Sequence, residues 1–253
     1  MKYLLKFLPR KLLIRYSFYF LPILRLIFKG SKFIDPIDGS GYSKFLSYGY
    51  NNIRKNALCP GTLSLERHRL LWLYLKYETN ILKSNLKVLH VAPEQIFYKK
   101  FKKFSHWSYL TFDINSPIAD IKGDLKSMEF EDESFDLIIC NHVLEHIEDD
   151  RKALREIYRV LKNNGISILQ VPININREKT FEDPKITSIS EREKHFGQYD
   201  HVREYGIDYK SRIEEVGFIV EMINYTDNLS EDIINKYGLL KNDLIPIAKK
   251  IIE

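Results

Sequence analysis

The feature that most constrains the fold of this chain is an alternation of short apolar segments and amphipathic segments from residue 85 onward. Phe135–Cys140 is an almost continuous apolar run, which is typical of a strand buried on both faces of a parallel sheet. Residues 149–161 follow with apolar side chains at helical spacing, and Ile166–Val171 is a further apolar run. Strands that alternate with helices predict an α/β fold whose parallel sheet has right-handed crossovers.

Three shorter strands are predicted upstream, over residues 87–92, 109–112 and 119–121. Helices are predicted over 63–78 and 93–104, the second because a proline suits its first turn. In an open α/β sheet, ligands bind at the carboxyl ends of the strands. The residues that directly follow each strand are therefore the candidate binding residues.

Two aspartates follow predicted strands. Asp113 lies about 20 residues beyond the first strand, where a carboxylate accepts hydrogen bonds from ribose hydroxyls in nucleotide-binding folds. Asp124, which precedes Leu125, is placed to accept a hydrogen bond from an adenine amino group. Each aspartate has an alternative interpretation as a turn residue. We favour nucleoside contacts for both, because the surrounding pattern agrees.

The strand over 135–140 is followed by four further candidates. Asn141 and His142 are predicted to contact a cofactor, whereas Glu145 and His146 are candidate catalytic residues. The alternatives are structural. The helix dipole alone favours a glutamate in a first helical turn, and both histidines are compatible with simple packing roles.

The stretches Gly123–Leu125 and Ser134–His146 resemble the middle of class I methyltransferases, in the group called methyltransferase type 11. The resemblance covers roughly residues 85–172. It implies S-adenosylmethionine as cofactor and a Rossmann-like sheet of seven strands in the order 3-2-1-4-5-7-6, whose last strand is antiparallel. Residues 218–225 and 244–248 are the candidates for strands six and seven.

The loop after the first strand departs from this family, whose members have an acid and two or three glycines there. This chain has His90, Ala92, Pro93 and Glu94 at these positions, so no glycine lets the backbone approach the cofactor closely. Ala92 is small, Pro93 fixes the turn, and Glu94 is expected to accept from the cofactor's amino group. The alternative is that the cofactor pocket has been lost.

A long and densely charged segment, residues 172–206, follows the fifth strand. Connections of this length are uncommon unless they are functional, and this one lies where a substrate must enter, so we predict a lid. His201 is the first candidate for a general base, Arg203 is a candidate for holding an anionic substrate group, and Glu204 is a further candidate. The alternative is a segment whose charges pair with one another and face solvent.

Residues 1–30 are both basic and apolar, and positions 1–29 hold seven basic residues and no acidic one. Their uncharged stretches are too short for a transmembrane helix, which needs about 20 apolar residues. We predict peripheral contact between residues 1–29 and an anionic membrane; the alternative is a helix that packs on the domain. The rest of the chain is slightly acidic, so nucleic-acid binding is not expected.

A narrower resemblance connects residues 56–69 and 196–206 with bacterial methyltransferases that are encoded beside polysaccharide genes. Some of the proteins in this resemblance look to have a zinc ribbon before the first helix. In this chain only Cys59 remains of such a site, so residues 31–62 are predicted to be a degenerate ribbon without zinc. A methyltransferase domain over 63–253 follows, and no metal site is predicted in it.

Together these patterns predict a cytoplasmic S-adenosylmethionine-dependent methyltransferase that acts on a small-molecule or glycan-related acceptor at the inner membrane surface. The alternative, which the missing glycines favour, is a methyltransferase-like module that binds a partner without catalysis. A dinucleotide oxidoreductase is disfavoured because no Gly-x-Gly-x-x-Gly follows the first strand. The two cysteines, Cys59 and Cys140, form no disulfide framework, which favours a reducing compartment.

Overall fold

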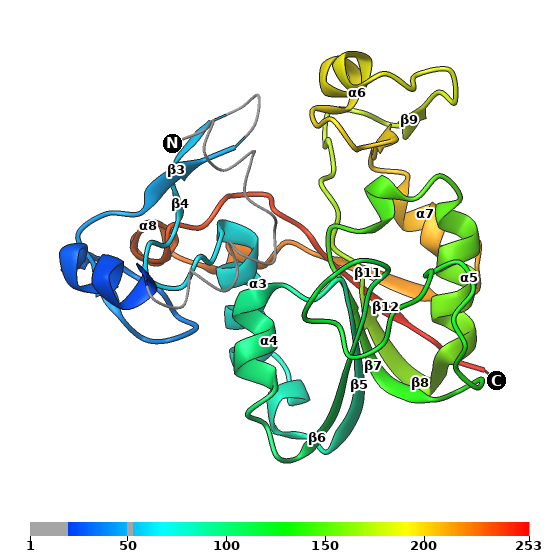
Figure 1. The fold of residues 1–253 in the computed structure, drawn as a ribbon, viewed down its shortest axis with the longest axis horizontal. Helices are drawn as coiled ribbons and strands as arrows, with labels where there is room; N and C mark the ends of the chain where they lie inside the picture. The colour runs from blue at the N-terminus through cyan, green and yellow to red at the C-terminus, as the bar shows by residue number, and fades with distance from the viewer. Residues whose placement is uncertain (1–19, 50–52, 253) are drawn as a thin grey trace. The chain divides into compact units, whose positions relative to one another are not determined.

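The computed structural model describes residues 20–49 and 53–252, and the chain divides into two compact units (Figure 1). The first unit comprises Met1–Glu78 and Thr226–Lys241, and the second comprises Thr79–Tyr225 and Asn242–Glu253. Each unit is therefore assembled from parts of the chain that are distant in sequence.

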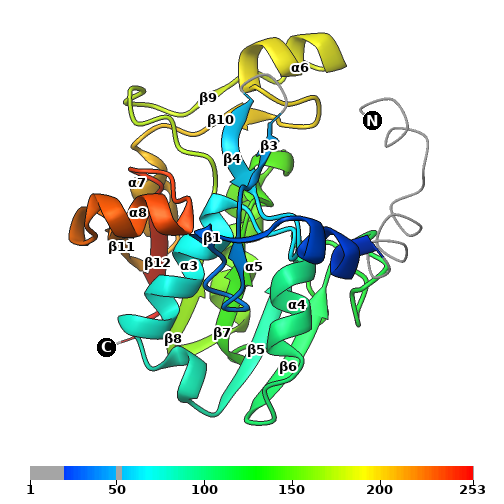
Figure 2. The same cartoon turned by 90° about the vertical axis from the view of Figure 1, so that its left-hand side faces the viewer.

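A six-stranded sheet forms the centre of the second unit (Figure 2). Its order is β11-β12-β8-β7-β5-β6. The strands are β5 (Leu86–Val91), β6 (Trp107–Phe112), β7 (Phe135–Cys140), β8 (Leu161–Ile168), β11 (Ile219–Ile223) and β12 (Ile245–Lys249). The four strands β5 to β8 are parallel, whereas β12 runs antiparallel to both of its neighbours. The sheet is therefore of mixed direction.

Helices cover both faces of this sheet. Helix α5 (Asp150–Val160) begins at Asp149, whose side chain accepts from the backbone N–H of Lys152, and it buries an apolar stripe in the same core as Leu89 and Val91 of β5. Helix α4 (Gln95–Phe101) lies on the other face, where the ring of Phe101 is 6.1 Å, centroid to centroid, from that of His90 in the same strand β5. Alternate residues of a strand point to opposite faces, so β5 contributes to both layers. Helix α7 (Tyr209–Glu214) adds Tyr209 and Ile213 to the α5 side.

The predicted third strand over 119–121 is reduced to a single bridge between Phe112 and Ile121, so the sheet has six strands and not the predicted seven. The reason is local. The carboxylate of Asp120 accepts the backbone N–H of Thr111 at 3.1 Å and its hydroxyl at 2.6 Å. A side chain thereby occupies a position that a ladder carbonyl would take, and the pairing ends.

The chain passes from α5 into the next strand without a loop. Helix α5 ends at Val160 and β8 begins at Leu161. The pairing of β8 with β7 shifts register between Leu161 and Ile166, and Asn164 in between has a φ of 61°. The asparagine and glycine thus form an irregularity inside the strand.

The described part of the first unit includes two short antiparallel pairs, β1 (Lys29–Ile34) with β2 (Gly41–Tyr42) and β3 (Leu46–Tyr48) with β4 (Arg54–Leu58). It also includes the helices α3 (Glu66–Tyr77) and α8 (Glu231–Tyr237), besides the helical residues 20–27. Its core includes Phe33, Tyr42, Phe45 and Cys59, a buried thiol that forms no disulfide. Helix α3 begins after Leu65, and the hydroxyl of the preceding Ser64 donates to Asp35 at 2.7 Å.

The predicted amphipathic segment over 1–29 lies mostly outside the described residues. Residues 20–27 are helical, and Phe20, Ile23, Leu26 and Ile27 on this helix are exposed. Within the part of the chain that the structure describes, no helix is both long and apolar enough to cross a membrane.

Candidate functional site

The carboxyl ends of β5, β6, β7 and β8 carry most of the residues predicted to contact a cofactor. The turn after β5 is built around Ala92, which has a φ of 48°, a left-handed conformation that glycine adopts readily and alanine rarely. The backbone N–H of Ala92 donates to the carbonyl of Phe112 at 2.8 Å, which fixes this turn on β6. Alanine therefore adopts here a backbone conformation that glycine usually supplies.

Glu94 and His90 form a pair in the second unit. His90 is fully buried, its Nε2 lies 2.6 Å from a Glu94 carboxylate oxygen, and its Nδ1 lies 2.7 Å from the Tyr109 hydroxyl. Burial raises the pKa of Tyr109, so this hydroxyl stays protonated and donates to Nδ1. Nε2 then carries the imidazole proton and donates to Glu94. Sequence reasoning missed Tyr109, whose spacing in β6 gave no signal.

Asp113 and Asp124 each organise a turn. One carboxylate oxygen of Asp113 accepts from the backbone N–H groups of Asn115, at 2.7 Å, and Ser116. Asp124 accepts from the N–H of Lys126 at 2.9 Å, and its side chain is partly exposed at 42%. The second oxygen of Asp124 lies 3.6 Å from the Nζ of Lys126. The predicted ribose and adenine contacts of these residues remain predictions, and buried Leu125 lies beside Asp124.

The edge between β7 and β8 holds two buried amides. Asn141 accepts from the backbone N–H of Gln170 at 3.4 Å, and the carbonyl of Gln170 accepts from the N–H of His142 at 2.7 Å. Among the described residues, neither Asn141 Nδ2 nor Gln170 Nε2 has a hydrogen-bond partner, although both are buried. Buried donors of this kind normally have partners, so this edge has unused capacity for a ligand. The sequence analysis did not identify Gln170.

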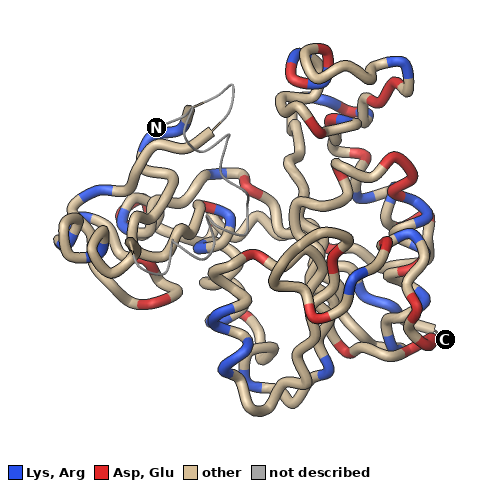
Figure 3. Tube along the Cα trace, viewed as in Figure 1, with Lys and Arg blue, Asp and Glu red and all other residues tan. Residues whose placement is uncertain are grey.

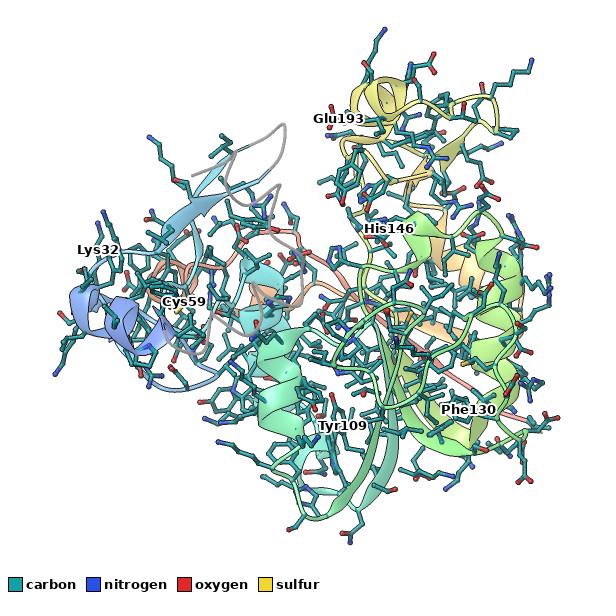
Figure 4. The ribbon with its side chains drawn as sticks, in the orientation of Figure 1. Lys32, Cys59, Tyr109, Phe130, His146 and Glu193 are labelled. Atoms are coloured by element: carbon teal, nitrogen blue, oxygen red, sulfur yellow. The ribbon has the colours of Figure 1, made fainter. Side chains whose placement is uncertain are left out.

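Two predicted catalytic residues lie on the short helix η2 (Leu144–His146), and the lid segment brings a third beside them. The rings of His146 and His201 meet edge to face with centroids 4.8 Å apart. Figure 4 labels His146 in the second unit. One ligating atom of each of Glu145, His146 and His201 lies within 4.8 Å of the other two. The structure thus brings together residues that are more than fifty positions apart.

Glu145 is 2% exposed and remains ionised. Burial alone would raise its pKa, but the hydrogen bond from His142 and the nearby imidazoles outweigh burial, and the net pKa is lowered. His142 Nδ1 lies 3.1 Å from one Glu145 oxygen. The other oxygen has no hydrogen-bond partner among the described residues.

The two histidines have defined orientations. Nδ1 of His201 lies 3.2 Å from the carbonyl oxygen of Phe196, and Nδ1 of His146 lies 3.2 Å from that of Asp200. A carbonyl accepts only, so each Nδ1 carries a proton and each Nε2 has a lone pair. Burial lowers the pKa of His201, which favours its neutral, basic form near pH 7. His201 therefore has the electronic state that a general base requires.

Arg203 does not offer its guanidinium to a substrate in this structure, and the expected anion-binding role needs correction. The residue is 2% exposed. Its Nη1 donates to the carbonyls of Leu144 and Ile147, its Nη2 donates to the carbonyl of Glu148, and its Nε donates to Glu182 at 2.8 Å. Four of the five guanidinium N–H groups are thereby used. Arg203 instead holds the backbone of η2 in place.

The lid segment contains β9 (Phe181–Glu182), α6 (Ile189–Phe196) and β10 (Arg203–Glu204), and β9 pairs with β10. Figure 3 shows acidic and basic residues mixed along it. A buried ionic network fixes its base. Arg212 of α7 contacts Asp150 at 2.7 Å and Glu182 at 2.8 Å, and the Tyr205 hydroxyl donates to Asp150 at 2.7 Å. Glu204 pairs with Arg177 at 2.7 Å, so many lid charges pair with one another.

A cavity of about 200 Å³ opens between η2, the chain after β8 and the lid segment. It is lined by Glu145, Pro172, Ile173, Asn174, Phe196, His201, Arg203 and Glu204. The lining thus includes four residues that the sequence singled out: Glu145, His201, Arg203 and Glu204.

Residues 78–169, which span β5 to β8, match the family model described as a methyltransferase domain. This segment is a methyltransferase domain of the S-adenosylmethionine-dependent class. The domain carries Asp113, Asp124 and the run from Asn141 to His146, whereas His201 and Arg203 lie beyond the matched residues.

Parts of the chain are also similar in sequence to two curated proteins. An uncharacterised methyltransferase, YcgJ, of Bacillus subtilis is 46% identical over 48 residues, which cover 19% of each chain. An uncharacterised protein of Methanocaldococcus jannaschii is 41% identical over 150 residues, which cover 45% of this chain and 66% of the relative. The chain thus spans less than two thirds of the length of these curated relatives. The solved structure of YcgJ aligns with a TM-score of 0.49 at 17% identity, over 74% of this chain and 100% of that one.

Proposed function

We propose that this protein is an S-adenosylmethionine-dependent methyltransferase that acts on a small-molecule or glycan-related acceptor bound in the cavity beneath the lid segment. The observation that carries the proposal is the match of residues 78–169 to the methyltransferase domain. The cavity, with a volume of about 200 Å³, favours an acceptor group of small size.

The residues at the carboxyl edge fit the cofactor. Ala92 already has the left-handed backbone that brings the chain close to a ligand, and Asn141 Nδ2 is a buried donor without a partner among the described residues. Asp113 and Asp124 would hold the ribose and the adenine, and the 90–94 loop, Leu125 and His142 would surround the rest. Glu94 already accepts from His90, so its pairing with the amino group of the cofactor would use its remaining capacity as an acceptor.

When bound, S-adenosylmethionine supplies an activated methyl group on its sulfonium sulfur. The protein's own contribution is to bind the acceptor, to exclude water and to hold the attacking atom in line. His201 is proposed as the general base, because its Nε2 lone pair belongs to a ring that lines the cavity. Glu145 and His146 orient this base, and Arg203 positions η2.

Calorimetric titration of the full chain with S-adenosylhomocysteine tests cofactor binding, and transfer of a labelled methyl group to an acceptor panel of small hydroxyl compounds and sugars tests turnover. We expect binding in the wild type and in His201→Ala, with methyl transfer lowered about 100-fold or more in the variant. His195→Ala, an exposed lid histidine, serves as the control. Binding without any transfer supports the alternative of a non-catalytic module, and absence of binding refutes both the enzyme and its cofactor.

We further propose that the helix over 20–27 contacts the inner face of a membrane. Its exposed apolar residues Phe20, Ile23, Leu26 and Ile27, together with Arg25, favour an interfacial position. Sedimentation with vesicles that contain anionic lipid should recover the wild-type chain, and Leu26→Glu should reduce this recovery. Equal recovery of both forms would refute the contact.

A further inference from the structure

Three side chains that can each bind a cation lie close together beneath the lid segment. Their ligating atoms are a carboxylate oxygen of Glu145 and one ring nitrogen each of His146 and His201, all within 4.8 Å of one another. Because each Nδ1 faces a carbonyl oxygen, Nε2 is the nitrogen of each ring that is left to bind a ligand. Such a cluster of lone pairs is unfavourable unless a cation or a donor lies among them.

The second oxygen of Glu145 provides independent support. Glu145 is 2% exposed, and its side chain lines the cavity. This oxygen has no hydrogen-bond partner among the described residues. A buried charged acceptor that has no hydrogen bond destabilises the folded protein. The cost is offset if a positive ion binds there.

The surroundings of the cluster also resemble those of metal-binding histidines. Such a histidine usually donates its other ring N–H to a carbonyl or carboxylate, which fixes the tautomer and the ring orientation. Both rings have this arrangement, and Asp200 Oδ2 adds a second acceptor 3.5 Å from His146 Nδ1. The backbone is held as well, because Val202 N–H donates to the carbonyl of Glu145 at 2.9 Å.

We propose that Glu145, His146 and His201 bind one divalent transition-metal ion, with Zn²⁺ as the ion that best suits two nitrogens and one carboxylate oxygen. Mg²⁺ and Ca²⁺ prefer oxygen ligands and suit the cluster less well. Bonds of about 2.0–2.2 Å require each side chain to shift inward by roughly 0.5–1 Å. Resting on the proposed function, an ion bound by His201 Nε2 would use the lone pair otherwise assigned to the general base, and the ion itself would polarise an oxygen of the acceptor in place of that base.

The proposal is tested on the full chain after dialysis against a chelator. Titration with Zn²⁺ alone should show one ion per chain, and Co²⁺ should give visible absorption bands that Zn²⁺ abolishes. Glu145→Gln, His146→Ala and His201→Ala should each weaken Zn²⁺ affinity about 100-fold or more, whereas the control His195→Ala should not. Circular dichroism checks the fold of each variant, and the Co²⁺ spectrum of the wild type gives an answer even if a variant unfolds.

Absence of Zn²⁺ binding to the wild type, or wild-type affinity in any folded variant of the three, overturns the metal site. S-adenosylhomocysteine binding is measured on the same samples by a separate titration. Binding of Zn²⁺ without binding of S-adenosylhomocysteine supports the metal site and refutes the proposed function. Binding of S-adenosylhomocysteine without binding of Zn²⁺ refutes the metal site and leaves the proposed function standing. The two proposals therefore fail separately.

Discussion

In the loop after β5, an alanine takes a backbone conformation that usually belongs to glycine. Ala92 adopts a φ of 48° because the turn after β5 is fixed by its hydrogen bond to Phe112 and by the following proline. For an L-amino acid other than glycine, this conformation lowers the stability of the folded state by about 1–2 kcal/mol. The backbone geometry of the site is thus kept at the expense of stability.

We expect Ala92→Gly to raise the free energy of unfolding by about 1 kcal/mol, because glycine removes the steric cost of the left-handed conformation. Urea denaturation of the wild type and the variant measures the change. The control is Ala119→Gly, a loop alanine whose φ is not positive. This second change should lower stability, and an Ala92→Gly variant no more stable than the wild type would contradict the strain argument.

At the scale of elements, the lid segment is connected to the sheet domain through charged side chains. Asp150 of α5 is 1% exposed and contacts Arg212 and Tyr205, while Glu182 of β9 joins Arg203 to Arg212. Removal of one partner leaves a buried charge without compensation, which costs more than the loss of an exposed ion pair.

Asp150→Asn should destabilise the protein by about 3–5 kcal/mol and increase hydrogen exchange in residues 177–206, since Arg212 loses its buried counter-charge. Hydrogen exchange with mass spectrometry measures both effects. Glu215→Gln is the matched control, because its ion pair with Arg151 is exposed and should contribute about 1 kcal/mol or less. Unchanged exchange in the lid of Asp150→Asn would show that the network does not hold this segment.

The same network predicts a pH dependence. Burial alone would raise the pKa of Glu182, but hydrogen bonds from Arg212 and Arg203 outweigh it, and the net pKa is lowered from 4.5. Its stabilising contribution is therefore present above the unfolded pKa and is lost as the pH falls through the lower folded value. Wild type should be more stable than Glu182→Gln at pH 7, and urea denaturation should show this difference shrinking below pH 4.5. A difference that stays constant down to pH 3 would contradict the lowered pKa.

At the scale of the whole molecule, the first unit depends on a part of the chain that follows β11. Arg69 of α3 is fully buried and donates to the carbonyls of Ala57 and Ser64, and also to those of Tyr237 and Gly238 at 2.6 and 2.7 Å. Its guanidinium also lies over the ring of Phe45. One side chain thus connects three segments of this unit.

Arg69→Met should destabilise the first unit by about 3 kcal/mol or more, because several buried carbonyls lose their donor. Hydrogen exchange of residues 226–241 and thermal unfolding measure the effect. Arg67→Met, a partly exposed neighbour on the same helix, serves as the control and should change stability by about 0.5 kcal/mol or less. Retained protection of residues 226–241 in Arg69→Met would contradict this role.

The sequence predicted the elements whose signals are local. The limits of β7 at Phe135–Cys140 were predicted correctly, because a continuous apolar run is a local signal, and the amphipathic stripe of α5 was also recognised. The third strand was wrong because the carboxylate of Asp120 competes for a backbone donor. Periodicity contains no information about such a side-chain interaction.

The site residues that follow strands could be predicted from local sequence, whereas those that depend on contacts with distant segments could not. Placing candidate residues after strands identified Glu145, His146 and, through the lid, His201, which the structure brings together. The network of Arg203 could not be predicted, because its carbonyl partners lie in another segment and spacing does not reveal them. Tyr109 and Gln170 were missed for the same reason, since each acquires its role only from a neighbouring strand.

The discontinuity of the two units has a practical consequence for anyone who wishes to study the methyltransferase half alone. Cutting the chain before residue 79 would leave residues 226–241 between β11 and β12. Their carbonyls would lose the guanidinium donor of Arg69, and the segment would lose the core in which it folds. Such a fragment would expose apolar surface and aggregate. A sound excision replaces 226–241 by a short turn between β11 and β12, and the same position is the natural point at which to insert a reporter domain.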